Sequence, residues 1–445
     1  MSETGEALGI EIAPKPLTAG QRLKSILGGA AGNFVEWFDW FAYVSFAIYF
    51  SSSIFPGGDQ TTQLLKVYLP FALGFLARPI GAYVMGLYAD YAGRRAALKL
   101  SVALMCAGSL IVGLVPTYAA AGFLSPLILS VGRVVQGLSV GGEYGASATY
   151  ISEMSTRGHR GFWSGFLYVT IILGQLAALL LLVLMQQFLT EQQLSEWGWR
   201  VPFILGAVLA LGVYFIRSRL HESQSFSAGK KTESRSKTMM LFMQYPRETA
   251  MIVLLTAAGG SGFYFFTSYM KDFLTNSALG PDGKGFSKED AALIATGLLA
   301  CFMLFQPLVG ALSDKIGRKI VLVTSFAAGA VLTYPISIAI MNATSTMEAF
   351  LYGLLPLVFL AGYTSISAII KAEMFPVHVR TLGVALPYAV AQALFGGNVG
   401  TAALSLKKAG HEPVMFMILA ALLAVGFIVA LAMRDTREHS LIAEH

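Results

Sequence analysis

Long apolar segments alternate with short polar ones along almost the whole chain. About twelve of them are long enough to be membrane-crossing helices, since a hydrocarbon core of about 30 Å takes about 20 helical residues. In the first half they cover residues 26–50, 64–89, 96–115, 120–153, 161–188 and 199–217. In the second half they cover 247–272, 289–312, 319–341, 345–374, 381–404 and 412–434. The pattern predicts an all-α polytopic membrane protein.

The polar segments divide the chain into two comparable parts. Residues 1–25 form a polar tail, 218–246 a linker rich in Ser, Lys and Arg, and 435–445 a second tail. We therefore expect two six-helix bundles, 26–217 and 247–434, related by pseudo-symmetry.

A charged turn occurs once in each of these bundles, and 224 residues separate Asp90 from its counterpart Asp314. An acid followed seven residues later by an arginine is also repeated, as Glu153 with Arg160 and Glu373 with Arg380. Such repeats are typical of transporters built from two similar halves. The first copy of the turn comprises Gly86, Asp90, Gly93, Arg94 and Arg95, and the second Gly310, Asp314, Gly317, Arg318 and Lys319.

These charged residues predict a latch at one end of the bundle. Acids and bases at neighbouring helix ends pair readily, and such pairs hold one gate conformation rather than select a substrate. The alternative is a turn that only satisfies helix ends and sets topology. The expected gate residues are Asp90, Arg94, Arg95, Glu153, Arg160, Asp314, Arg318, Lys319, Glu373 and Arg380.

Composition agrees with a lipid environment. The chain is 55% hydrophobic and only 13% charged, whereas soluble domains contain about 25% charged residues. The net charge of +6 does not indicate nucleic-acid binding, because the basic residues concentrate in alternate loops. That bias places both termini in the cytoplasm. Cys106 and Cys301 lie inside apolar spans, so we expect no disulfide, metal or cofactor.

Three basic residues fall inside predicted spans, where an isolated cation costs about 3 kcal/mol. Arg78 lies near the middle of the second span and Arg133 in the fourth. Guanidinium groups bind carboxylates in a bidentate manner, so both arginines predict an organic diacid as ligand. The alternative is an internal ion pair with an acid of the first or fourth span. Lys371 is expected either to close the cavity over the substrate or to extend to the membrane surface.

The first span carries Asn33, Glu36, Asp39 and Tyr43 within about 120° of one another, and therefore on one face. Two carboxyls three residues apart in a low dielectric should not both be charged, because desolvation and mutual repulsion raise the pKa of at least one of them. A raised pKa suits a proton carrier. Asp39 is the first choice for this role and Glu36 the second. A permanent salt bridge to an arginine is the alternative.

Further polar residues extend this predicted cavity. Gln136, Tyr144 and Ser147 share a helical face with Arg133. Glu143 follows two glycines and is either a structural hydrogen-bonding residue or a weaker proton carrier. Among the apolar residues near 264, Tyr264 is the useful donor. The predicted substrate residues are Arg78, Arg133, Tyr43, Gln136, Tyr264 and Lys371.

The repeated turn resembles the hallmark of the major facilitator superfamily. The runs GNFVEWFDWFAY (32–43), RVVQGLSVGGEYGASATYISE (133–153) and KAEMFPVHVRTLGV (371–384) resemble its metabolite:proton symporter family. The resemblance implies a bacterial inner-membrane protein that takes up a small organic acid with protons by alternating access. It favours 2-oxoglutarate, with citrate, another dicarboxylate, betaine or proline, and shikimate-like acids as alternatives.

Other function classes fit the sequence less well. We find no catalytic or metal-ligand spacing and no phosphate-binding loop, so neither an enzyme nor an ATP-driven pump is expected. A sensor that binds without transporting remains an alternative to a symporter. The expected partners are the organic acid, the proton and the lipid bilayer, with no nucleic acid and a monomeric protein.

Overall fold

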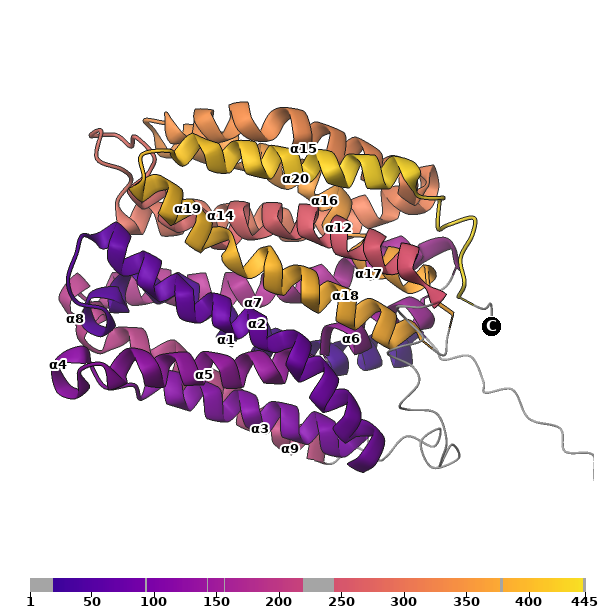
Figure 1. Cartoon of the computed structure of the whole chain (residues 1–445), viewed down its shortest axis with the longest axis horizontal. Coiled ribbons are helices and arrows are strands. Elements are labelled where there is room, and N and C mark those ends of the chain that lie inside the picture. Colours follow the sequence, from indigo (N-terminus) through magenta and orange to yellow (C-terminus); the bar gives the residue numbers. More distant parts are fainter. Residues whose placement is uncertain are drawn as a thin grey trace, which may run out of the picture.

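The computed structural model describes residues 19–92, 94–141, 143–155, 157–218, 244–376 and 379–442, and every regular element in these ranges is helical. In Figure 1 the first-half helices (indigo to magenta) fill the lower part of the bundle, and the second-half helices (salmon to yellow) the upper part. The predicted linker 218–246 and the tail 1–25 lie largely outside the described residues.

The first half is built from long helices joined by short turns. Small helices α4 (Tyr118–Ala121) and α8 (Glu191–Glu196) and the 3-10 turns η1 (Arg157–His159) and η2 (Gly198–Arg200) lie between them. The long helices are α1 (Ala19–Ile54), α2 (Gln60–Ala92), α3 (Arg94–Gly113), α5 (Leu124–Val140), α6 (Glu143–Met154), α7 (Arg160–Phe188) and α9 (Val201–Ser218).

The second half has the same alternation. Its elements are α12 (Pro246–Phe263), the π-helical turn η3 (Tyr264–Ser268), α13 (Met270–Asn276), α14 (Lys288–Ile316), α15 (Arg318–Met341), α16 (Thr346–Thr364), α17 (Ser367–Glu373), α18 (Arg380–Leu394), the 3-10 turn η4 (Gly396–Asn398), α19 (Val399–Lys408) and α20 (Glu412–Ala432).

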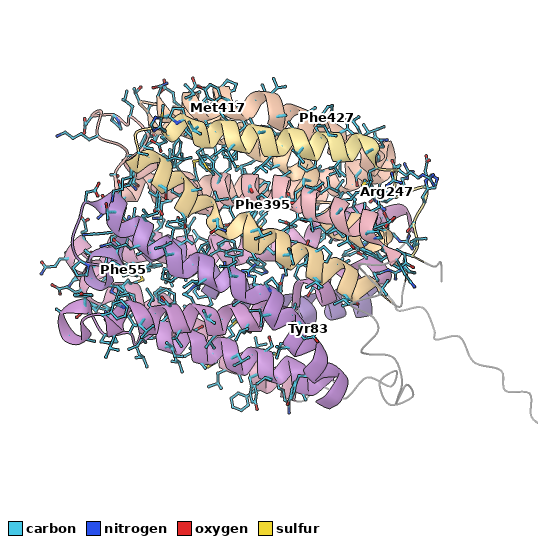
Figure 2. The ribbon with its side chains drawn as sticks, viewed as in Figure 1. Phe55, Tyr83, Arg247, Phe395, Met417 and Phe427 are labelled. Carbon is cyan, nitrogen blue, oxygen red and sulfur yellow. The ribbon has the colours of Figure 1, made fainter. Side chains whose placement is uncertain are left out.

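The surface of the bundle is suited to lipid. Ten helical segments in the described ranges are long and apolar enough to cross a membrane, and α1 and α3 cover the remaining two predicted spans. Large apolar side chains such as Met417 of α20 and Tyr83 of α2 are more than half exposed on the outer faces (Figure 2). The predicted all-α polytopic fold is confirmed.

Several spans that the sequence predicts as continuous are interrupted. The fourth divides into α5 and α6 beside Gly141, and the tenth into α16 and α17 at Ser365 and Ile366. In the seventh, the amide of Tyr269 donates to the carbonyl of Tyr264 at 2.9 Å, five residues back, as in a π-helix. Irregular backbone inside a membrane protein is tolerated where protein surrounds it, and these breaks all lie next to the buried polar residues.

Helices α7 and α14 bring the two halves together along their length. Their close approach depends on small residues, as in other membrane helix pairs. A Cβ atom added to Gly165 would lie 2.7 Å from the carbonyl oxygen of Gln306, and Gly161 faces Gly310 in the same way. Helices α2 and α18 form a second contact between the halves.

Candidate functional site

The indole ring of Trp40 on α1 packs against two guanidinium groups, one from each of two other helices. The Cζ atoms of Arg78 on α2 and Arg133 on α5 both lie 4.0 Å from its ring centroid. Both arginines are buried, with 2% and 0% of their surface exposed. The structure therefore brings the two predicted arginines together, on an aromatic residue that the sequence analysis did not single out.

Within the described part of the chain, none of the three guanidinium nitrogens of Arg78 has a hydrogen-bond partner. The ring of Phe75, at 4.0 Å, contacts it in addition to Trp40. Each desolvated cation–π contact stabilises a cation by about 2 kcal/mol. Burying a charge costs several kcal/mol per ion even after relaxation. The rings offset only part of that cost, so the site is suited to an anion.

Arg133 is linked to an acid, but only through an amide. Its Nη1 donates to Oε1 of Gln136 at 2.7 Å, and Nε2 of Gln136 donates to a carboxylate oxygen of Asp39. Among the described residues no acid forms an ion pair with either Arg78 or Arg133. This differs from the alternative prediction of an internal ion pair with an acid of the first or fourth span. Gln136 thus connects the predicted proton carrier to one of the predicted substrate ligands.

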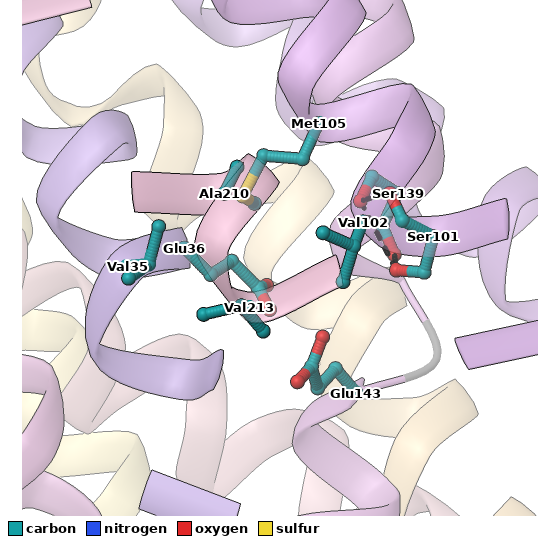
Figure 3. A pocket seen from close by; sticks show the side chains of 9 residues that line it. All are labelled: Val35, Glu36, Ser101, Val102, Met105, Ser139, Glu143, Ala210 and Val213. Atoms are coloured by element: carbon teal, nitrogen blue, oxygen red, sulfur yellow. Dashed lines mark hydrogen bonds between the residues drawn. The ribbon is translucent and has the colours of Figure 1, made fainter. Parts of the chain in front are cut away.

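The other two predicted acids face a different space. Glu36 and Glu143 project into one pocket lined by α1, α3, α5, α6 and α9, all of the first half (Figure 3). Asn33 turns elsewhere and donates to Thr170 of α7 at 2.6 Å. Asp39 is therefore the predicted acid that meets the arginine cluster, while Glu36 and Glu143 lie on its flank.

The tyrosines of the predicted site differ in what they offer. Tyr43 donates its hydroxyl to the carbonyl of Val67 at 2.8 Å, so only its ring, 4.4 Å from Arg133, faces the cluster. The buried hydroxyl of Tyr264 has no hydrogen-bond partner. Its ring packs edge-on against Phe75 at 5.2 Å. Tyr264 thus places a buried hydroxyl next to the arginine site, and its role as a donor to the substrate stays a prediction.

Lys371 is buried at 1% exposure, so it does not extend to the membrane surface. Its ammonium donates to the hydroxyl oxygens of Ser367 at 2.8 Å and Tyr144 at 3.2 Å. Tyr144 belongs to the first half and Lys371 to the second. This lysine therefore lies at the central seam between the halves, and the alternative of a surface-seeking lysine is wrong.

At the end of the bundle that carries the repeated turn, here called the motif end, the second half caps a helix of the first. The carboxylate of Asp314 accepts hydrogen bonds from the amides of Gly161 and Phe162 at 2.8 and 2.9 Å. These are the second and third residues of α7, whose own N-cap residue makes no side-chain cap. Asp314 does across the interface what an N-cap side chain does within one helix.

A buried ion cluster lies beside this cap. Arg318 forms an ion pair with Glu373, and Arg160 of the first half lies 4.0 Å from the same carboxylate. Lys319 instead donates to the carbonyl of Leu431 at 2.8 Å, and Arg380 to backbone oxygens including that of Leu441, also at 2.8 Å. Among the predicted gate residues, Arg160, Asp314, Arg318 and Glu373 meet across the halves, whereas Lys319 binds a carbonyl within the second half.

The first copy of the motif is only partly visible. The backbone places Asp90 in the last turn of α2 and Arg94 at the start of α3. The side chains of Asp90, Arg94, Arg95 and Glu153 lie outside the described residues, so their predicted pairing stays a prediction.

At the far end of the bundle the halves also meet through polar contacts, which include a partly exposed ion pair between Lys288 of α14 and Glu191 of α8. The hydroxyl of Tyr68 on α2 donates to Asp272 on α13 at 2.9 Å. Asp272 also forms an ion pair of 2.7 Å with Lys271. Lys271 stands at the end of the predicted span 247–272, next to the following loop, but it is buried. The reason is that α13 turns this pair toward α2 rather than toward water.

Comparisons with known proteins agree with this architecture. Residues 26–246 match the family described as Sugar (and other) transporter, and residues 262–444 match the Major Facilitator Superfamily. The alpha-ketoglutarate permease of Escherichia coli is 44% identical over 92% of this chain and 93% of its own length. The chain belongs to the major facilitator superfamily. The resemblance predicted from the repeated turn is confirmed.

Two further proteins are less similar to this chain than that permease is. The citrate-proton symporter of Salmonella typhi is 30% identical over 93% of this chain and 94% of its own length. The proton:xylose symporter XylE, solved with 6-bromo-6-deoxy-D-glucose, superposes with a TM-score of 0.76 at 18% identity, over 96% of this chain and 98% of its own. At that identity the solved structure supports the fold alone.

Some residues of this superfamily member were missed by the sequence analysis. Trp40 stands three residues before Tyr43 in an aromatic run that is as typical of packing as of a site. Tyr388, whose ring stacks on Tyr144 at 3.6 Å, carried no charge to mark it. Asp272 was adjacent to Lys271 and had a detectable signal, namely an acid at the edge of an apolar span.

Proposed function

We propose that this protein is a proton-coupled symporter that imports a small organic dicarboxylate, 2-oxoglutarate above all, by alternating access. The observation that carries the proposal is Arg78, a buried guanidinium between two aromatic rings with three unpaired nitrogens. A dianionic substrate supplies the missing charge and acceptors. The 44% identical alpha-ketoglutarate permease supports the choice of substrate. Citrate is the second candidate, supported by the 30% identical citrate-proton symporter.

The proposed coupling runs through Asp39, with Glu36 and Glu143 as reserve carriers. When Asp39 takes a proton, its hold on Gln136 weakens, and Arg133 is released from its internal partner to bind a carboxylate. Loss of the proton on the other side reverses the change. Coupling therefore uses one hydrogen-bonded chain, Asp39 to Gln136 to Arg133, rather than a direct salt bridge.

The proposed transport cycle uses the contacts between the halves as gates. The motif end, with Asp314, Arg318, Glu373 and Arg160, faces the cytoplasm together with both termini, in a bacterial inner membrane. Both ends carry contacts between the halves, which suits an occluded step of the cycle. The protein works as a monomer, since each chain holds a complete set of site residues.

The test is uptake of labelled 2-oxoglutarate into proteoliposomes with an imposed pH gradient. We expect wild type to accumulate substrate, Arg78→Ala to lose uptake, and Asp39→Asn to exchange substrate without accumulating it. Wild-type vesicles that transport citrate or a betaine but not 2-oxoglutarate would overturn the substrate. Accumulation that persists in Asp39→Asn would overturn the coupling residue.

A further inference from the structure

Lys371 is a second buried cation without an acid partner. Its two hydrogen-bond acceptors, Ser367 and Tyr144, are neutral hydroxyls. An ammonium has three N–H donors, and the carboxylates of the described residues form no ion pair with it. Like Arg78, it lies in the protein interior without the counter-charge that its charged form requires.

Three tyrosine rings surround this ammonium. The Nζ atom lies 4.5 Å from the ring centroid of Tyr388, 5.2 Å from Tyr144 and 5.6 Å from Tyr363. Ring faces attract a cation and also exclude water. A cage of this kind keeps the ammonium desolvated in one position, where it interacts strongly with an anion that enters.

Side chains of helix α18 form part of a run of contacts that leads from Lys371 to Arg78. Tyr388 contacts the lysine, and Gln392 lies one turn further along α18. A Cβ atom added to Gly396 would clash with Oε1 of Gln392 and would lie 3.0 Å from the ring of Tyr264, so these two side chains are neighbours. Tyr264 packs on Phe75, which contacts Arg78. A run of contacting side chains therefore connects the two cations, one on each half of the chain.

Two connected cations, one on each half, suit the two ends of one short diacid. Four carbon–carbon bonds of about 1.5 Å place the carboxyl carbons of a five-carbon diacid roughly 5 Å apart when extended. Gln392 and Tyr264 belong to the side chains that connect the two cations, and Oε1 of Gln392 is buried without a hydrogen-bond partner among the described residues. A ligand held at both cations would pass these two groups.

We propose that Lys371 binds the distal carboxylate of the substrate and thereby selects diacids over monoacids, while Arg78 binds the proximal one. The inference rests on the proposed function, since it assigns roles within the same site. A diacid then bridges α2 of the first half and α17 of the second. A monoacid with the same carbon chain is held by the first half only.

The test compares two ligands that differ by one carboxylate. Purified protein in proteoliposomes exchanges labelled 2-oxoglutarate, and unlabelled 2-oxoglutarate or 2-oxopentanoate competes. The measured quantity is the ratio of the two inhibitory concentrations, for wild type, Lys371→Met and Arg78→Gln. Lys408→Gln is the matched control, because Lys408 is exposed at the end of α19.

We expect Lys371→Met to lower the preference for the diacid by tenfold or more, the usual effect of losing a hydrogen bond to a charged group. Arg78→Gln should weaken both ligands together and leave the ratio within a few-fold of wild type. The Lys408→Gln ratio should equal that of wild type. Equal losses for both ligands in Lys371→Met would show a structural role and overturn the inference.

Two further arms keep the test decisive. If Lys371→Met does not reach the membrane, Ser367→Ala removes one of the two hydrogen bonds that hold the ammonium, and the ratio should fall several-fold. An unchanged ratio in Ser367→Ala would then count against the inference. If wild type exchanges neither acid, the proposed function itself is overturned. That outcome is distinct from a Lys371→Met variant that keeps the wild-type preference, which overturns the inference alone.

Discussion

The two ends of the bundle are closed by different chemistry. At the motif end, Asp314 caps α7 with two charge-assisted hydrogen bonds, and Glu373 lies between two arginines. At the far end, one tyrosine hydroxyl meets one buried carboxylate, and the ion pair between Lys288 and Glu191 is partly exposed to solvent. Buried charged contacts lose more when one partner is removed than neutral ones do. Single substitutions should therefore open the motif end further than the far end.

Both ends can be followed with pairs of spin labels on exposed residues, in a protein whose Cys106 and Cys301 are replaced by serine. His159 and Glu438 flank the motif end, and Asp59 and Lys408 flank the far end. An increase in the distance between the labels of one pair, without a change in the other, identifies the end that opens.

We expect the largest effect from Glu373→Gln. The change removes one of the two acids that pair with the buried Arg318, leaving Asp314 at 3.9 Å, and weakens the contact to Arg160. Breaking a buried ion pair typically costs about 3–5 kcal/mol. The motif-end labels should move apart, and the melting temperature in detergent should fall. A label distance equal to that of wild type would contradict a gating role for this cluster.

The next largest effect is expected from Asp314→Asn. An amide oxygen still accepts from α7, but the negative charge at the helix N-terminus is lost, a change of about 1–2 kcal/mol. The motif-end distance should broaden toward the open value, less than in Glu373→Gln. Measuring the double variant shows whether the two act through one interface, since coupled sites are not additive.

A smaller effect is expected from Tyr68→Phe at the far end. The ring packing remains, and Asp272 keeps Lys271, so only one hydrogen bond of about 1–2 kcal/mol is lost. The labels at Asp59 and Lys408 should move apart while the motif-end pair does not. If the motif-end pair responds instead, the two ends are not separate gates.

The smallest effect is expected from Lys319→Gln. This lysine belongs to the repeated turn, but its ammonium binds a carbonyl of α20 within the second half. An exposed hydrogen bond of this kind is worth less than about 1 kcal/mol. Neither label pair should change. A shift at the motif end would show that the turn works through all its basic residues rather than through Arg318.

Much of this architecture could be read from the sequence because the bilayer restricts the choices. Span length, the repeated turn and the placement of Arg78, Arg133 and Lys371 follow from the cost of polar groups in lipid. Their mutual contacts do not follow. The helical-face argument grouped Asn33 with Asp39, but the neighbours α7 and α5 draw them to different sides.

The aromatic residues that surround the buried cations could not be predicted from the sequence either. Trp40 and Tyr388 are ordinary apolar positions until a cation from another helix lies over them. The interruption between α5 and α6 separates Arg133 from Tyr144, which an unbroken helix would have placed on one face. Tertiary packing decides which aromatic residues of a membrane bundle become ligands of charge.

The contact between Tyr68 and Asp272 depends on the number of residues in the π-helical turn η3. Such a turn accommodates one residue more than an α-helical turn does, so everything after it is rotated by about 100° relative to an uninterrupted α-helix. Asp272 reaches Tyr68 from the far side of that turn. Removing a single residue between positions 264 and 268 would restore regular winding and point Asp272 away from α2, with every side chain of the contact still present in the sequence.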